Sequence, residues 1–174
     1  KHGLRWGVTT HLERTYSWFN VNKGADEKGP HAGVPYDGAD PSNAEYYIES
    51  HDDTDLRHPL NPPASWCQTW ARRMKDLIDN YQPDHLYLDG AIPFQGDDDA
   101  RTGMELMAYY YNRNQEWHDG RQECVMCIKD HADHGTYISG VATQDMERSL
   151  AADLLPEPWQ TDTSIGPWGY HTGA

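Results

Sequence analysis

Asp89 is the residue of this sequence best placed to do chemistry. It follows the short apolar segment His85–Leu88 and precedes Gly90, and Pro83 separates that segment from a helical pattern upstream. In sheets of alternating strands and helices, catalytic groups gather where the strands end, so a carboxylate at this point is a candidate catalytic group. Asp-Gly is also ordinary turn chemistry, and the alternative is an aspartate that only stabilises a turn.

Asp89 lies in the segment 81–90, which is one of four segments that are informative when taken together. The four segments are residues 3–12 leading into 14–19, residues 81–90, residues 145–148 and residues 158–170. In this order they resemble the catalytic domain of family 29 glycoside hydrolases, the α-L-fucosidases. The resemblance implies an α/β fold, a (β/α)8 TIM-type barrel, that removes terminal α-L-fucose from glycans through a covalent glycosyl-enzyme intermediate.

The resemblance also implies roles for individual residues. Retaining glycosidases use two carboxyl groups about 5 Å apart, one as nucleophile and one as acid and then base. Asp89 matches the nucleophile, and Glu147, within Asp-Met-Glu-Arg, matches the acid/base. The candidates for contact with the sugar are His11, Trp18, Tyr87 and Trp168, and no metal or other cofactor is implied.

Some of these assignments have alternatives. Glu157 and Glu123 are other candidates for the acid/base, and Glu147 could instead be an exposed carboxylate paired with a neighbouring arginine. Tyr87 stands where many relatives have tryptophan. The family's His-His-Asp-Gly block, which helps to grip fucose, does not occur in this sequence.

Two other patterns suggest metal sites and are weaker. Cys124 and Cys127 with His131 and His134 superficially resemble a zinc site, but residues three apart in a strand face opposite sides, and the spacing to the histidines is short for a zinc finger. The acidic stretches 51–55 and 96–99 lack the regular ligand spacing of a calcium loop. We interpret the acidic stretches as turns and helix caps.

Composition narrows the class of partner. The 14 basic and 28 acidic residues give a formal net charge of −14, which argues against nucleic acid and anionic membranes as partners. The sequence has no apolar run of about 18 residues that could span a membrane. Seven Trp and eleven Tyr against two Phe suit a cleft for a neutral ligand with hydroxyl groups and apolar faces, such as a fucosylated glycan. Three cysteines cannot all pair within one chain.

The elements that must position these residues alternate along the chain. A helix is expected over 64–80, and a second helix begins near Asp98 or Asp99. The apolar face of the first helix is expected to consist of Trp66, Trp70, Met74, Leu77, Ile78 and Tyr81. A long irregular stretch, 13–63, is expected to form part of the wall of the substrate pocket. Strands are expected over residues 4–10, 85–89 and 123–129, with weaker candidates at 136–141 and 159–163. This order demands parallel pairing through crossover helices.

Length sets a further expectation. The 174 residues fall short of the roughly 250 of a complete barrel. We therefore interpret 1–174 as part of one catalytic domain that lacks its N-terminal strands, and expect it to aggregate and to be inactive when expressed alone. The alternatives are an inactive carbohydrate-binding fragment or another barrel glycosidase. The resemblance suggests a secreted, periplasmic or lysosomal protein, and the sequence does not indicate an oligomeric state.

Overall fold

The protein is an α/β structure with one parallel sheet. The computed structural model describes residues 3–18, 23–48, 51, 59–129, 140–147, 149, 151–167 and 169. The strands are β1 (Gly7–Thr10), β2 (His85–Leu88), β3 (Val125–Lys129), β4 (Thr143–Asp145) and β5 (Trp159–Gln160). The α-helices are α1 (Thr15–Trp18), α2 (Ala64–Tyr81) and α3 (Arg101–Trp117), and three short 3-10 helices are η1 (Leu12–Arg14), η2 (Asp37–Ala39) and η3 (Pro41–Tyr46).

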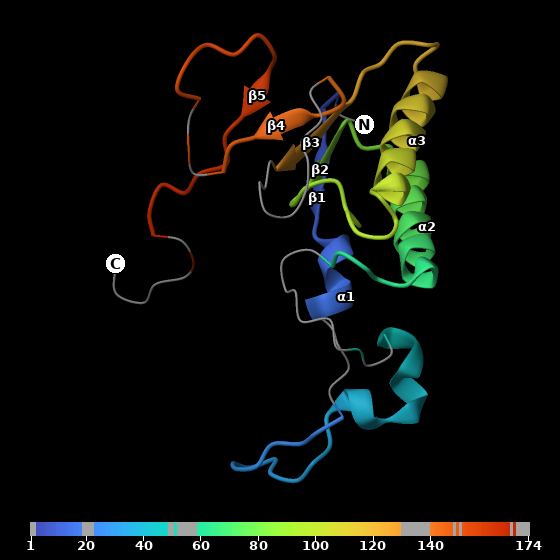
Figure 1. Cartoon of the computed structure of the whole chain (residues 1–174), viewed down its shortest axis with the longest axis vertical. Coiled ribbons are helices and arrows are strands. Elements are labelled where there is room, and N and C mark those ends of the chain that lie inside the picture. Colours follow the sequence, from blue (N-terminus) through green and yellow to red (C-terminus); the bar gives the residue numbers. More distant parts are fainter. Residues whose placement is uncertain are drawn as a thin grey trace.

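The five strands pair in the order in which they occur in the chain. Every pair is parallel, from β1 with β2 to β4 with β5. Helix α2 lies between β1 and β2 in the sequence, and α3 lies between β2 and β3 (Figure 1). The parallel pairing and the crossover helices predicted from the sequence are therefore confirmed.

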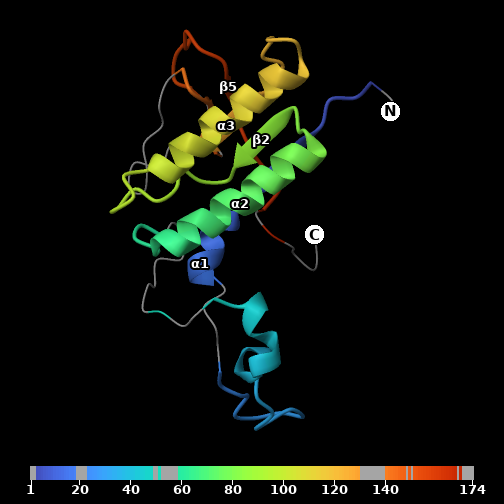
Figure 2. The same ribbon diagram turned by 90° about the vertical axis from the view of Figure 1, so that its right-hand side faces the viewer.

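The two long helices pack side by side against one face of the sheet (Figure 2). Helix α2 buries four of its six predicted apolar positions, Trp66, Trp70, Met74 and Ile78, against Leu86 and Leu88 of β2 and Met126 and Ile128 of β3. Leu77 is only partly buried, and the prediction is wrong for Tyr81, which ends the helix and is exposed. The other large members of this core come from α3 and the loop before it: Leu106, Met107, Tyr110, Ile92 and Phe94. Burial of these side chains is the main contribution to holding the helices on the sheet.

The ends of the helices follow from local sequence. After Tyr81, Gln82 takes a left-handed conformation with φ of 46°, and Pro83 prevents the helix from continuing. At the start of α3 the Asp98 carboxylate accepts hydrogen bonds from the amide and the hydroxyl of Thr102, at 2.8 and 3.0 Å. The prediction that Asp98 or Asp99 supports this helix start is confirmed for Asp98. It also accounts for one of the acidic clusters as a helix cap.

The other face of the sheet is polar. Side chains alternate along a strand, and paired residues of parallel strands point to the same side. Tyr87 pairs with Cys127, Cys127 with Thr143, and Lys129 with Asp145, so these five residues share the face opposite the helices. The sheet thus divides into an apolar face that carries the core and a polar face that is available for chemistry.

Four of the predicted strands need corrected bounds. β1 begins at Gly7 and β3 at Val125, two or three residues later than expected. The candidate strand 136–141 is wrong in its last two residues, because Gly140 and Val141 form a turn and β4 starts at Thr143; its first four residues lie outside the described part. β5 has only two residues.

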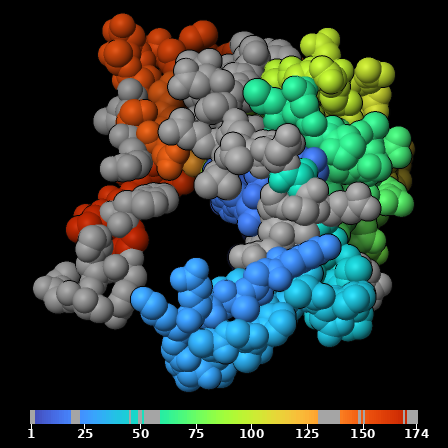
Figure 3. Space-filling view, turned by 60° about the horizontal axis from the view of Figure 1, so that its bottom comes forward, coloured from blue at the N-terminus to red at the C-terminus, as the bar shows by residue number. Residues whose placement is uncertain are grey.

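The long irregular stretch contains little regular structure. Within its described residues 23–48 are two 3-10 helices and one isolated bridge between Ala25 and Pro35. This segment lies beyond α1, on the side of the sheet where β1 ends (Figures 1 and 2). Figure 3 turns that side forward and shows an opening between the segment and the red C-terminal residues. Among the described helices, none is long and apolar enough to cross a membrane.

Candidate active site

The ends of four neighbouring strands bring a row of polar side chains together. Lys129 and Asp145 are the last residues of β3 and β4, whereas His11 and Asp89 directly follow β1 and β2. The strand ladder continues through this row, because the Asp89 amide donates to the Thr10 carbonyl at 3.1 Å. Since the pairing is parallel, four segments far apart in the sequence place these side chains at one edge.

Lys129 joins the two carboxylates at the centre of this edge. Its Nζ contacts Oδ1 of Asp89 and lies 2.9 Å from Oε2 of Glu147, which follows β4. The Lys129 side chain is 6% exposed, that of Asp89 is 18% exposed and that of Glu147 is 31% exposed. The ammonium group therefore lies on the buried side of the two carboxylates, and Glu147 is the most solvent-exposed of the three residues.

This shared contact limits the distance between Asp89 and Glu147. Two oxygens in contact with one nitrogen are separated by no more than about two hydrogen-bond lengths, or roughly 5–6 Å. That range is close to the roughly 5–5.5 Å between the carboxyl groups of retaining glycosidases and lies below the roughly 6.5–9.5 Å of inverting ones. The two carboxyl groups therefore lie close enough to act on the same bound molecule.

On the other side, Asp89 is flanked by residues from the turn after β1. Nε2 of His11 contacts Oδ2 of Asp89, and Arg14 Nη2 donates to the Asp89 carbonyl at 2.6 Å. The Trp18 ring lies 5.4 Å from the His11 ring and 5.5 Å from the Arg14 guanidinium carbon. The predicted residues His11, Trp18 and Asp89 thus form one continuous group.

These neighbours set the charge of Asp89. Burial alone would raise the pKa of its carboxyl, but Lys129, His11 and Arg14 outweigh burial and hold that pKa below its usual value. Burial likewise opposes the charge of Lys129, and the two carboxylates outweigh it, so the pKa of Lys129 lies above its usual value. Asp89 and Lys129 are therefore an ionised pair at neutral pH.

Tyr87 lies below this row and does not face the solvent. Its hydroxyl donates to Oδ2 of Asp145 at 2.5 Å, and its ring centre is 5.9 Å from Nζ of Lys129. Burial, followed by the hydrogen bond to Asp145, strongly raises the pKa of the Tyr87 hydroxyl. Tyr87 is thus a neutral donor that fixes the Asp145 carboxylate beside Lys129.

Glu13 is a second buried carboxyl group near the site. Its side chain is 1% exposed, and Nε of Arg14 lies 3.8 Å from its Oε1. Burial, which outweighs the nearby Arg14, raises the pKa of Glu13 to about 8. Glu13 is therefore largely protonated at neutral pH and ionises only in mildly alkaline solution.

This shift predicts how stability depends on pH. An unfolded Glu13 ionises near pH 4.5 and a folded one near 8, so the folded state binds the extra proton between these values and stability falls as pH rises through them. Replacing Glu13 with Gln should leave the free energy of unfolding nearly unchanged at pH 4 and raise it by about 2–5 kcal/mol at pH 9.

Urea unfolding of both proteins at the two pH values measures this difference. Glu105→Gln, a change at an exposed position of α3, is the matched control and should show no such divergence. Parallel curves for wild type and Glu13→Gln across this range would contradict the assignment.

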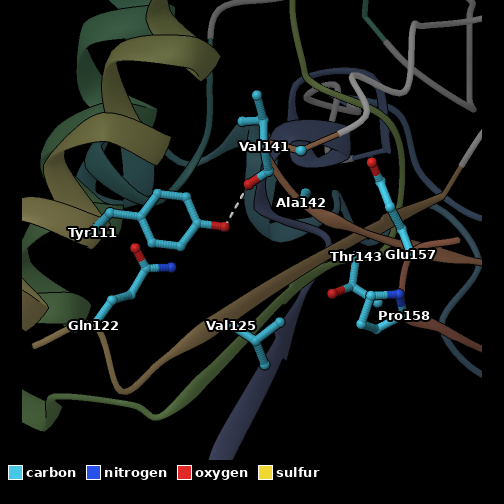
Figure 4. A pocket seen from close by; sticks show the side chains of 9 residues that line it. Tyr111, Gln122, Val125, Val141, Ala142, Thr143, Glu157 and Pro158 are labelled. Atoms are coloured by element: carbon cyan, nitrogen blue, oxygen red, sulfur yellow. Dashed lines mark hydrogen bonds between the residues drawn. The ribbon is translucent and has the colours of Figure 1, made fainter.

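The alternative acid/base candidates lie at the opposite end of the sheet. Glu123 precedes β3 and binds Arg5 at 2.6 Å and Arg121 at 3.0 Å. Glu157 precedes β5 and lines a cavity with Val125 at the start of β3 (Figure 4). At about 3.3 Å per residue, the length of β3 separates this end from Asp89 by more than 10 Å. Of the three glutamates, only Glu147 lies beside Asp89.

The structure gathers five of the six predicted site residues, His11, Trp18, Tyr87, Asp89 and Glu147. Trp168 lies outside the described residues. Sequence reasoning missed Lys129 and Arg14. The signal for Lys129 was available, since it is a charged residue that ends an otherwise apolar strand, as Asp89 follows one.

The metal alternatives find no support in the part of the chain that the structure describes. No group of three or more His, Cys, Asp or Glu in that part could hold a metal ion. The Cys127 thiol is buried and donates to Oε1 of Gln160 at 3.1 Å, and all three cysteines are free thiols. Residues 52–55, His131 and His134 lie outside the described residues.

The sequence matches the model of a known protein family. A family model described as Alpha-L-fucosidase matches residues 3–174, which is nearly the whole chain. No curated protein matches it. The match covers all five strands and every described residue of the candidate site.

Proposed function

Because the chain belongs to the α-L-fucosidase family of glycoside hydrolases, we propose that it cleaves terminal α-L-fucose from glycans with retention of configuration. The family implies a fucosylated glycoside as substrate. The observation that carries the mechanism is the contact of Lys129 with both Asp89 and Glu147. This contact supports the short carboxylate separation of a retaining enzyme.

Asp89 is the nucleophile of the first step. One of its carboxylate oxygens attacks the anomeric carbon, and the bond from that carbon to the leaving-group oxygen breaks. Glu147, as a carboxylic acid, gives its proton to the departing oxygen. The low pKa of Asp89 supports this division, since a nucleophilic carboxylate must be ionised.

Glu147 acts as a base in the second step. Its carboxylate takes a proton from water, the water oxygen attacks the anomeric carbon, and the ester bond to Asp89 breaks. Fucose leaves with the configuration of the substrate, and both carboxyl groups return to their starting states. The greater exposure of Glu147 supports this role, because it must meet both the leaving group and water.

The residues around Asp89 form the proposed binding site for fucose. A histidine can both donate to and accept from sugar hydroxyls, which suits His11. Trp18 is 43% exposed and can stack on the apolar face of the sugar. Tyr87 acts indirectly through Asp145 and Lys129, and Trp168 remains a proposed contact from the sequence resemblance.

The proposed framework is a (β/α)8 barrel, of which 1–174 form part of one catalytic domain. The all-parallel sheet, with α2 and α3 on one face and the polar side chains on the other, supports this arrangement. In such barrels the active site lies at the carboxyl ends of the strands. The site proposed here has that location.

The activity can be tested on the full-length protein with aryl glycosides. We expect turnover of an aryl α-L-fucoside and at least 100-fold lower kcat/KM for the matching galactoside, because a site shaped by the fucose hydroxyls discriminates strongly. Proton NMR of the first product should show the α-anomer. Release of the β-anomer would exclude the retaining mechanism, and fucose binding without turnover would favour a carbohydrate-binding protein.

A further inference from the structure

We propose that Lys129 is a positioning residue, whose ammonium group holds Asp89 and Glu147 at their mutual distance and acts as a shared counter-ion during the reaction. This inference rests on the proposed function and adds a residue to it. It is based on one contact from Lys129 to each carboxylate, which come from the ends of β2 and β4. Lys129 thereby links two catalytic groups that have no strand pairing with each other.

The burial of Lys129 is difficult to explain without such a role. A lysine side chain that is 6% exposed loses most of its hydration, which costs free energy unless opposite charges compensate. Nζ of Lys129 also lies over the Tyr87 ring, 5.9 Å from its centre, and the face of an aromatic ring stabilises an ammonium group. Buried ammonium groups of this kind repay their cost only through their partners, here the two carboxylates.

The other charged groups around Lys129 favour the same arrangement. Asp145 is its partner in the register of β4, and Tyr87 from β2 holds the Asp145 carboxylate by a hydrogen bond. His11 and Arg14, from the turn after β1, face Asp89 from the side away from Lys129. Negative groups therefore surround Lys129, and the described positive groups lie beyond Asp89.

The proposed cycle uses this asymmetry. In the free enzyme the ammonium group contacts both carboxyl groups and pairs with the ionised Asp89, while Glu147 carries the proton that it gives in the first step. When Asp89 forms an ester with the sugar, its negative charge disappears and the attraction of Lys129 is directed to Glu147. This favours the carboxylate of Glu147 in the second step, where that group must accept a proton from water.

Lys129→Met is the main test, because methionine has similar length and no charge. Lys129→Arg retains the charge and is the conservative variant. Lys75→Met is the matched control, since it removes one positive charge from α2, where Lys75 lies over the Tyr109 ring away from the site. All three are compared with wild type in the full-length protein.

The first measurement is the titration of the Asp89 carboxyl by carbon NMR, which needs no substrate. Loss of an opposite charge in contact should raise the pKa of Asp89 by about 1–3 units in Lys129→Met. Lys129→Arg should stay close to wild type, as should Lys75→Met. An unchanged Asp89 titration in a folded Lys129→Met protein would overturn the proposal.

The second measurement is the kinetics with an aryl α-L-fucoside. The acidic limb of the kcat/KM profile should move to higher pH in Lys129→Met. In addition kcat should fall by about tenfold or more, with a burst of aryl alcohol, because the second step loses assistance to its base. If both chemical steps became slower by the same factor, kcat would fall without a burst of aryl alcohol. That result would mean that Lys129 has only a structural role, and it would overturn the proposal.

The two measurements separate this inference from the proposed function. Absence of fucoside turnover by the wild type would count against the proposed function, whereas the Asp89 titration would still decide whether Lys129 controls that carboxyl. If the wild type turned over normally and Lys129→Met had an unaltered pH profile, Lys129 would not be a positioning residue. The assignment of Asp89 and Glu147 would remain intact.

Discussion

Replacement of Asp89 by Gly is expected to lower the turnover of α-L-fucosides by at least about 10⁴-fold in the full-length protein. The variant lacks the oxygen that would form the ester, and no other carboxylate contacts Lys129 from the same strand. The fold should survive, since the amide of residue 89 keeps its bond to the Thr10 carbonyl and the apolar core does not include this side chain. Initial rates and circular dichroism measure the two effects.

Azide provides a positive test of the same variant. The space left by Asp89→Gly can admit a small anion, which should restore turnover of an activated aryl fucoside and give the β-fucosyl azide by a single displacement. Asp84→Asn is the matched control, because Asp84 lies before the same strand and binds Arg5 away from the site. A variant that retained a tenth of wild-type turnover would show that Asp89 is not the nucleophile.

Replacement of Glu147 by Ala is expected to affect substrates unequally. Natural glycosides have poor leaving groups that need a proton, so their kcat/KM should fall by about 10²–10⁴-fold. Activated aryl fucosides need little help in the first step, and their kcat/KM should fall much less. The ratio of the two losses, measured on one preparation, reports the role of Glu147 as an acid.

Glu157→Ala is the control for this prediction. Glu157 lies at the amino end of the sheet, where it lines a cavity with Val125 and Thr143. Its replacement should leave kcat/KM near the wild-type value for both kinds of substrate. A result in which Glu147→Ala harmed both substrates equally, or neither, would contradict the assignment.

The elements with strong local signals were predictable from the sequence. The spacing of Trp66, Trp70, Met74 and Ile78 fixed the apolar face of α2, and Pro83 fixed its end. The apolar segment before Asp89 gave β2, and the family resemblance led to Glu147. The signals for α2 and β2 lie within each element or next to it, so tertiary context changed their bounds little.

The contacts within the site were not predictable in the same way. The sequence places Lys129 40 residues after Asp89 and 18 before Glu147, and only the register of β2, β3 and β4 makes them neighbours. Tyr87 illustrates the same limit, because its position two residues before Asp89 suggested that it orients the nucleophile or contacts the sugar. In the structure its hydroxyl is instead committed to Asp145.

The bounds of the weak strand candidates were inaccurate for a related reason. β4 and β5 have three and two residues, too few for a recognisable alternation, and their pairing with β3 determines where they lie. The turn at Gly140 and Val141 has apolar character that resembled a strand. Pairing partners, rather than local propensity, decide such short elements.

The division of the sheet into an apolar and a polar face makes the site a test of correct folding. A shift of one residue in the pairing of β3 would turn Lys129 toward the helices and bring Ile128 to the carboxylates. The same error would place an ammonium group in the apolar core, so a misregistered sheet loses stability at the moment it loses the site. Selection for a stable sheet and selection for neighbouring catalytic carboxylates therefore act on the same strand register. A change in that register would affect both stability and activity.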